Sequence, residues 1–222
     1  MNDTELKDWE KLMNSVIKSS IDSIVSVLPE NGVFIDVGAN IGSFSERVFK
    51  QRNCKKAYLF EPIPEYQKLC AKRFNQKENI IVEQYALSDV TGSTSMWVCK
   101  KVNFGWNTLV KEIASKGMDE IIVEAITFDD YAIKHSINHI DVIKIDVEAG
   151  EYKVLKGMKQ TLSSLFKKPY ILCEIGCGIN NHPYWKQEVE MFEWLIQNGY
   201  ERFDYNVRAT TDVLICPSKL GR

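Results

Sequence analysis

The sequence lacks the features that mark several broad classes of protein. No apolar run approaches the roughly 20 residues that a membrane helix needs, and the N-terminal segment has no apolar centre like that of a secretion signal. Basic residues are not in excess, because 28 Lys and Arg face 30 Asp and Glu, a formal net charge of -2. That balance argues against broad binding to a nucleic-acid backbone, although it leaves a local basic patch open. We therefore expect no membrane span and no nucleic-acid partner.

Paired cysteines and linkers are also missing. The six cysteines form no C-x-x-C pair, which is typical of reduced thiols in a cytoplasmic protein; Cys173 and Cys177 make a weak case for a metal. No repeat, low-complexity tract or Pro/Gly/Ser-rich linker divides the 222 residues, so we expect one domain over 1–222. Within it we expect an N-terminal helical extension over 1–30 and a strand-rich insertion over 91–126.

Short apolar runs alternate with amphipathic stretches, which is typical of βαβ units around a mostly parallel sheet. The expected strands are 33–37, 56–61, 79–87, 141–148 and 169–175, with a final antiparallel pair at 200–205 and 212–217. The expected helices are 4–27, 42–52, 62–76, 127–136, 150–166 and 187–199. The pattern predicts a seven-stranded α/β sheet with helices on both faces. Such sheets bind ligands beyond the carboxyl ends of their strands.

Polar residues follow three of these strands. The first strand ends at Asp36, in the spacing D-x-G-x-x-x-G, which lacks the second glycine of a dinucleotide fingerprint. Glu61 ends the second strand, 23 residues after Gly38, where an acid can accept hydrogen bonds from ribose hydroxyls. Ser88 and Asp89 follow the third strand, where they could bond an adenine amino group or simply form a turn. Together these residues describe a cradle for S-adenosylmethionine rather than for a dinucleotide.

The segment VIKIDVEAGEY, over 142–152, is the most informative stretch. Alternation along a strand puts Lys144, Asp146 and Glu148 on one side, although a central parallel strand is normally apolar on both. Burying three ionisable groups is unfavourable unless they pair or face a cleft. Lys144 can pair with Asp36 if the first and fourth strands are neighbours. The alternative is a purely structural cluster of ion pairs.

Four stretches resemble the FkbM family of S-adenosylmethionine-dependent methyltransferases. They are FIDVGANIGSFS, YLFEPIPEYQKL, ALSDVTG and ITFDDYAIKHSINHIDVIKIDVEAGEYKVLKGM, and the resemblance extends over roughly 33–175. The family pattern after the fourth strand reads D-V-E-G-x-E. Here Ala149 and Gly150 follow Glu148, so the glycine is displaced by one place while the spacing to Glu151 is kept.

The resemblance implies a Rossmann-like class I fold and transfer of a methyl group to an acceptor hydroxyl. It places the methionine part of the cofactor against Gly38, Ala39, Asn40 and Gly42, the ribose against Glu61 and the adenine against Ser88 and Asp89, with Asp36 and Asp146 completing the set. A sugar hydroxyl in a glycan or glycosylated metabolite is the first acceptor by family likeness. A polyketide or other natural product is the second, and a noncatalytic S-adenosylmethionine-binding module is the third reading. The oligomeric state is left open.

Two routes could make the acceptor hydroxyl nucleophilic. In the first, a general base takes its proton, and the candidate catalytic residues are Glu148, Glu151 and His182, with Lys144 beside them. In the second, a divalent cation such as Mg²⁺ is held by Asp146, Glu148 and Glu174 at the ends of adjacent strands, because oxygen ligands suit this ion.

Overall fold

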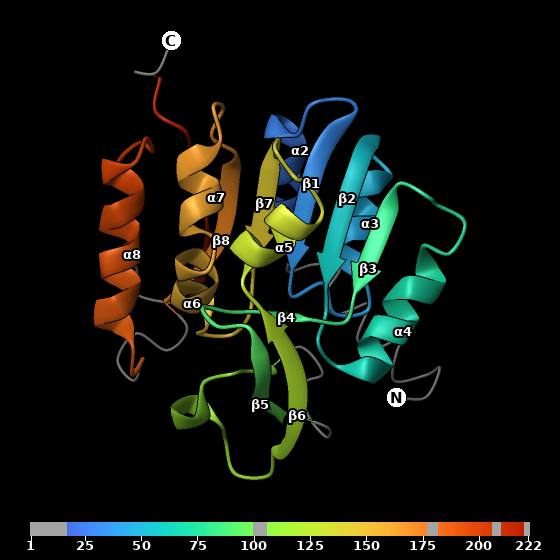
Figure 1. The fold of residues 1–222 in the computed structure, drawn as a ribbon, viewed down its shortest axis with the longest axis vertical. Helices are drawn as coiled ribbons and strands as arrows, with labels where there is room; N and C mark the ends of the chain where they lie inside the picture. Colours follow the sequence, from blue (N-terminus) through green and yellow to red (C-terminus); the bar gives the residue numbers. More distant parts are fainter. Residues whose placement is uncertain (1–16, 100–105, 177–181, 206–209, 220–222) are drawn as a thin grey trace.

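The computed structural model describes residues 17–99, 106–176, 182–205 and 210–219. Its centre is a six-stranded sheet in the order β3-β2-β1-β7-β8-β9 (Figure 1). The first five strands of this order run parallel, and β9 runs antiparallel to β8. The predicted α/β class and mostly parallel sheet are confirmed, and the order reverses between β1 and β7, where such sheets bind ligands.

The strands of the main sheet are short, and β7 is buried along its whole length. They are β1 (Gly32–Val37), β2 (Cys54–Phe60), β3 (Ile80–Glu83), β7 (Val142–Ile145), β8 (Tyr170–Ile175) and β9 (Thr211–Ile215). Alternate residues of β1 enter opposite cores, because Phe34 packs on one face of the sheet and Ile35 on the other. Asp36 is on the same side as Phe34 and stands opposite Lys144 in the pairing of β1 with β7.

Helices cover both faces of this sheet, as predicted. The helices are α2 (Lys18–Val27), α3 (Ser43–Phe49), α4 (Pro64–Arg73), α5 (Phe128–Lys134), α6 (Glu151–Lys156), α7 (Lys159–Ser164) and α8 (Trp185–Gln197), with a short 3₁₀ turn at Lys111–Ile113. One core gathers side chains of α5, α6, α7 and α8, and the other gathers those of α2, α3 and α4. Of the helix predicted over 4–27, the part before residue 17 lies outside the described residues.

A second, three-stranded sheet lies beyond the carboxyl ends of β1, β2 and β3 (Figure 1). It joins β4 (Ala86–Leu87), β5 (Gly92–Val98) and β6 (Asp119–Ile126), with β5 and β6 antiparallel. Its buried residues, among them Met96 and Val123, pack with Ile41 and Ile63 from the turns that follow β1 and β2. The small sheet therefore forms a wall over the edge at which polar residues gather.

Several predicted boundaries are wrong for identifiable reasons. The strand predicted over 79–87 divides into β3 and β4, which belong to different sheets. The segment 200–205 forms an isolated bridge between Tyr200 and Pro217 rather than a strand, and β9 pairs with β8, so the main sheet has six strands rather than seven. The helix predicted over 150–166 breaks at Gly157, where a Cβ atom would lie 2.0 Å from the carbonyl oxygen of Ser88. This close contact requires glycine and ends α6.

Candidate active site

A cavity runs along the carboxyl edge of the main sheet, from the end of β2 to the start of β9. Its polar lining comes from both halves of the sheet: Asn40, Ser43, Glu61, Asn107, Lys144, Asp146, Glu148, Glu174 and Asp212. Its apolar lining includes Phe44, Phe60, Tyr85, Leu87, Met96 and Leu109. The cavity thus spans the point where the strand order reverses, between β1 and β7.

The first strand end is organised by a buried ion pair. Lys144 Nζ lies 3.2 Å from Asp36 Oδ1 and 3.3 Å from Asp146 Oδ2, and it donates to the carbonyl oxygen of Gly38 at 3.1 Å. Ser45 donates its hydroxyl to Asp36, which is fully buried and does not line the cavity. Burial alone would lower the pKa of Lys144, but the two carboxylates raise it, so the ammonium form is favoured. The pairing predicted for Lys144 and Asp36 is present in the structure.

Replacing Lys144 with Met is expected to destabilise the fold by about 3–5 kcal/mol, because it leaves the buried Asp36 carboxylate without a cation. Denaturant unfolding measures this loss. The matched double variant Asp36→Asn/Lys144→Met removes both charges and is expected to be clearly more stable than Lys144→Met alone. A Lys144→Met variant as stable as the parent would show that the pair has no structural role.

Glycine is required in the turn after β1 by contacts within the protein. Gly38 has φ +80°, and a Cβ atom there would lie 2.0 Å from the carbonyl oxygen of Asp146. Gly42 has φ +81°, and its Cβ atom would meet the side chains of Phe74 and Cys70 in α4 at 2.7 and 2.9 Å. Gly38 lines the cavity with Ala39 and Asn40, whereas Gly42 does not. The two glycines therefore hold the β1 turn close to the β7 turn and to α4.

Glu61 joins the turns that follow β1 and β2. Its two carboxylate oxygens accept hydrogen bonds from the backbone N–H of Asn40 at 2.9 Å and of Ile63 at 2.8 Å. The side chain is 4% exposed and lines the cavity, so its remaining lone pairs can accept from a ligand. Burial raises the pKa of Glu61 to about 7, against the effect of these two hydrogen bonds.

Ser88 and Asp89 lie outside the cavity lining. Ser88 is buried, and its backbone N–H bonds the carbonyl oxygen of Ile126. Asp89 forms an ion pair with Lys156 at 2.8 Å. Because the chain leaves the main sheet after β3, the residues at this end of the cavity are Tyr85 and its neighbours Ala86 and Leu87. Sequence reasoning missed them since it treated 79–87 as one strand.

Asp146, Glu148 and Glu174 come together at the other half of the cavity. One carboxylate oxygen of each lies within 4.8 Å of the others. The strand β7 ends at Ile145, and Glu148 and Ala149 have φ of +57° and +70°, so Glu148 reaches the site from a turn rather than from the strand. Burial, followed by repulsion from Asp146 and other acids, raises the pKa of Glu174 to about 9.

Thr108, which sequence reasoning also missed, holds this turn from the side of the small sheet. Its hydroxyl donates to the carbonyl oxygen of Glu148 at 2.6 Å and accepts from the backbone N–H of Val110 at 2.9 Å. The side chain is 1% exposed. No sequence signal distinguishes this role of Thr108, because it depends on the pairing of Thr108 with Trp97 of β5, which brings it against the turn.

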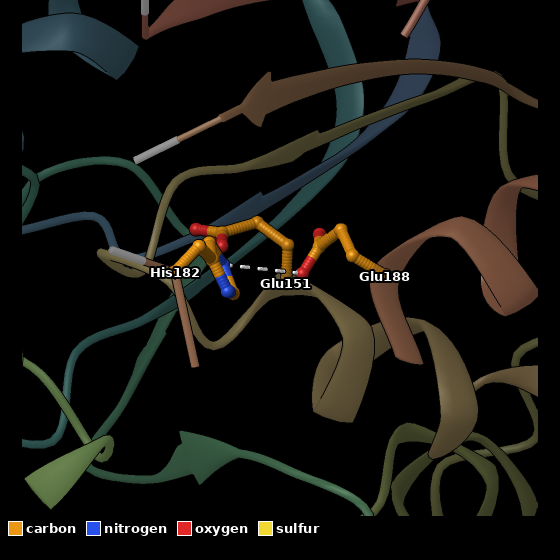
Figure 2. A group of neighbouring side chains, drawn as sticks. All are labelled: Glu151, His182 and Glu188. Atoms are coloured by element: carbon orange, nitrogen blue, oxygen red, sulfur yellow. Dashed lines mark ion pairs between the residues drawn. The ribbon is translucent and has the colours of Figure 1, made fainter. Parts of the chain in front are cut away.

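Glu151 and His182 lie behind the cavity wall rather than in it, in a buried group with Glu188 (Figure 2). Glu151 accepts a hydrogen bond from the backbone N–H of Val147 at 3.0 Å, so it supports the turn that carries Glu148. His182 Nε2 lies 3.6 Å from Glu188 Oε2, the contact drawn in Figure 2. Burial raises the pKa of both glutamates and lowers that of His182, which favours uncharged side chains.

The hydrogen bonds of His182 decide what this buried group can hold. The backbone N–H of Tyr184 donates to His182 Nδ1 at 3.1 Å, so in the neutral ring the proton is on Nε2, facing Glu188. A nitrogen that carries a proton cannot ligate a metal. The position of this proton therefore disfavours a cation site at Glu151, His182 and Glu188. Direct contact of Glu151 or His182 with an acceptor would require rearrangement.

Comparison with known proteins places these features in context. A family model described as a methyltransferase FkbM domain matches residues 36–202. The chain is 26% identical over 152 residues to the hexuronic acid methyltransferase AglP of Haloferax volcanii, which covers 68% of this chain and 59% of that protein. It is 26% identical over 153 residues to the 2-O-methyltransferase NoeI of Sinorhizobium fredii, with 63% of each covered. The chain thus spans about six tenths of the length of these relatives.

Solved structures are similar in fold. A candidate rRNA methylase from Clostridium thermocellum aligns with a TM-score of 0.54 and 9% identity, covering 91% of this chain and 94% of the other. A candidate methyltransferase from Streptococcus mutans in complex with SAH aligns with a TM-score of 0.52 and 13% identity, covering 90% and 94%. At such identities the likeness establishes the fold alone. No helix in the described ranges combines the length and apolar character that a membrane crossing requires.

Proposed function

The chain belongs to the FkbM methyltransferase family, and we propose that it transfers a methyl group from S-adenosylmethionine to a sugar hydroxyl in a glycan or glycosylated metabolite. The observation that carries this proposal is the cavity that joins the Gly38 turn and Glu61 to the acids Asp146, Glu148 and Glu174. The names of the two curated relatives support this proposal, because one is called a hexuronic acid methyltransferase, which names a sugar acceptor, and the other a 2-O-methyltransferase, which names transfer to an oxygen.

We place the cofactor against the β1 and β2 half of the cavity. The turn over 38–40 faces the methionine part, and Glu61 accepts from the ribose hydroxyls. The adenine lies toward Tyr85 and Leu87, in place of the predicted Ser88 and Asp89, which do not line the cavity. Asp36 acts indirectly, through the ion pair that holds Lys144.

The chemical step needs alignment and one proton acceptor. A sulfonium carries its own leaving group, so the protein mainly has to hold the acceptor oxygen, the methyl carbon and the sulfur in line. Glu148 lines the cavity beside Asp146 and is the proposed general base that takes the hydroxyl proton. Glu151 is a positioning residue in this proposal, because its carboxylate holds the Val147 N–H next to Glu148.

A divalent cation fits the three acids at this end of the cavity. Asp146, Glu148 and Glu174 offer oxygen atoms only, and Glu174 Oε2 is buried with no hydrogen-bond partner among the described residues. Bound there, Mg²⁺ would lower the pKa of a nearby hydroxyl and hold a sugar diol. Full activity in excess chelator, after extensive dialysis, would remove the metal from the proposal and leave the general base.

Cofactor affinity is expected to rise with pH through the pKa of Glu61, about 7. The ionised carboxylate accepts ribose hydroxyls better than the acid form, and below the pKa the acid form predominates. The affinity for S-adenosylhomocysteine should therefore fall about tenfold between pH 8 and pH 6, measured by calorimetry. The Glu61→Gln variant should bind more weakly with little pH dependence. A parent protein whose affinity does not change over this range would contradict the role of Glu61.

Transfer of a labelled methyl group tests the proposed reaction directly. Purified protein is incubated with labelled S-adenosylmethionine and either a panel of glycosides or a panel of phenolic and polyketide hydroxyl compounds. Label appearing in the glycosides is the expected result. Transfer only to polyketides would support the second acceptor class, and cofactor binding without transfer to any acceptor would support a noncatalytic module.

The remaining expectations form part of the same proposal. We treat 1–222 as one methyltransferase domain in which 1–30, 91–126 and the chain after Ile175 help to choose the acceptor. None of the five described cysteines forms a disulfide, which supports a reducing, cytoplasmic location. The net charge of -2 supports a small-molecule or glycan acceptor over a nucleic acid.

A further inference from the structure

A second cavity opens where α2, the end of β8 and the start of β9 meet. Its walls are polar throughout: Ser19, Ser20, Ser23, Glu174, Thr210, Thr211 and Asp212. Glu174 and Asp212 also line the main cavity, so the two spaces share a wall. In the sheet order, β8 and β9 are separated from β2 by β1 and β7, so this recess lies at the end opposite to Glu61.

The side chains of the recess are hydroxyls and carboxylates, which bind hydroxyl groups. Ser20 donates its hydroxyl to Asp212. Glu174 Oε2 is buried with no hydrogen-bond partner among the described residues, although a buried carboxyl oxygen normally has one. A sugar hydroxyl entering from the recess would supply the missing donor. No aromatic or large aliphatic side chain lines this second cavity, so a flat polyketide ring would find little apolar surface there.

The charge around the recess is one-sided. Asp146, Glu174 and Asp212 all line the main cavity, and Glu174 and Asp212 also line the recess. Among the described residues, Lys144 is the one cation that lines either cavity. It already pairs with Asp36 and Asp146. A carboxylate brought in by an acceptor would therefore find acids and no available cation.

We propose that this recess receives the acceptor and that the acceptor is an uncharged sugar, bound through its hydroxyls, rather than a hexuronate. The inference rests on the proposed function, because it names the substrate class of that same site. It also assigns Asp212 and Ser20 to acceptor recognition, because both line the recess. Like charges brought together in a site disfavour binding, whereas hydroxyl donors are favoured by the same carboxylates.

The test compares matched acceptors that differ only in one carboxyl group. Alkyl glucosides are assayed beside the corresponding alkyl glucuronides with labelled S-adenosylmethionine, in excess chelator and again with magnesium, because a cation bound by Asp146, Glu148 and Glu174 would itself attract a carboxylate. The expected result is a kcat/KM at least about tenfold higher for the uncharged glycosides in each buffer that supports transfer. Preference for the glucuronides would overturn the inference while supporting methyl transfer to sugars. Transfer to neither kind would count against the proposed function itself.

Substitutions test the role of the recess in acceptor preference separately from cofactor binding. Asp212→Asn removes one charge with little change of shape and is expected to raise kcat/KM for the glucuronide relative to the glucoside. The affinity for S-adenosylhomocysteine should stay unchanged in this variant. Asp119→Asn, an exposed residue at the start of β6, is the matched control and should leave the ratio as it is. A ratio equally unaffected by Asp212→Asn would contradict the proposed position of the acceptor.

Discussion

The Glu148→Gln variant is expected to turn over about 10²–10⁴-fold more slowly than the parent while binding S-adenosylhomocysteine almost as tightly. Gln keeps the size of the side chain but cannot take a proton. The turn itself should persist, because Thr108 and Glu151 hold its backbone at the carbonyl of Glu148 and the N–H of Val147. Initial rates at saturating cofactor measure the first effect, and calorimetry measures the second.

The matched control for this change is Glu120→Gln, which alters an exposed acid of β6 that does not line the cavity. Its rate should equal that of the parent. If Glu148→Gln also retains the full rate, Glu148 is not the base, and a bound cation would become the leading means of activating the hydroxyl. Loss of cofactor affinity with Glu148→Gln would instead assign the side chain to cofactor binding.

The Gly38→Ala variant is expected to lose both stability and cofactor binding. The backbone at φ +80° disfavours a side chain by about 1–3 kcal/mol, and the Cβ atom, 2.0 Å from the carbonyl oxygen of Asp146, adds overpacking of similar size. Relief of this contact would push the β1 turn away from β7 and deform the cavity between them. Denaturant unfolding and titration with S-adenosylhomocysteine measure the two losses.

The Gly117→Ala variant separates the effect of positive φ from the effect of a close Cβ contact. Gly117 also has positive φ, +100°, but a Cβ atom there meets nothing within 4 Å. The Gly117→Ala variant should lose only about 1 kcal/mol of unfolding free energy, because positive φ disfavours a side chain, and it should bind the cofactor normally. Equal behaviour of the two variants would show that the approach of Gly38 to Asp146 has no particular importance.

The sequence predicted best what depends on short-range patterns. Alternation along VIKID put Lys144 on the other side of the strand from Ile143 and Ile145. The pairing of Lys144 with Asp36 was predicted on the condition that the two strands are neighbours, and the structure meets that condition. The glycine turn and Glu61 were also found from spacing. In parallel sheets the apolar run of a buried strand ends at polar residues, so these positions can be recognised from the neighbouring sequence alone.

Features that depend on tertiary contacts were harder to predict. The chain leaves the main sheet at Gln84 and Tyr85, where the sequence is still typical of a strand, so Tyr85 and Leu87 line the cavity and Ser88 and Asp89 do not. Glu151 keeps the family spacing, yet its side chain is directed behind the wall, toward His182 and Glu188. Asp212 reaches the cavity only because β9 pairs antiparallel with β8, and no spacing along the chain indicates that pairing.

Calorimetric titration of the purified protein with S-adenosylmethionine, S-adenosylhomocysteine and NAD in parallel tests the central claim most directly. The claim is that the cavity at the switch between β1 and β7 is built for S-adenosylmethionine. We predict micromolar binding of the first two compounds, loss of that binding in Gly38→Ala but not in Gly117→Ala, and no heat with NAD. Binding of NAD alone, or cofactor binding unaffected by Gly38→Ala, would contradict the assignment of this cavity.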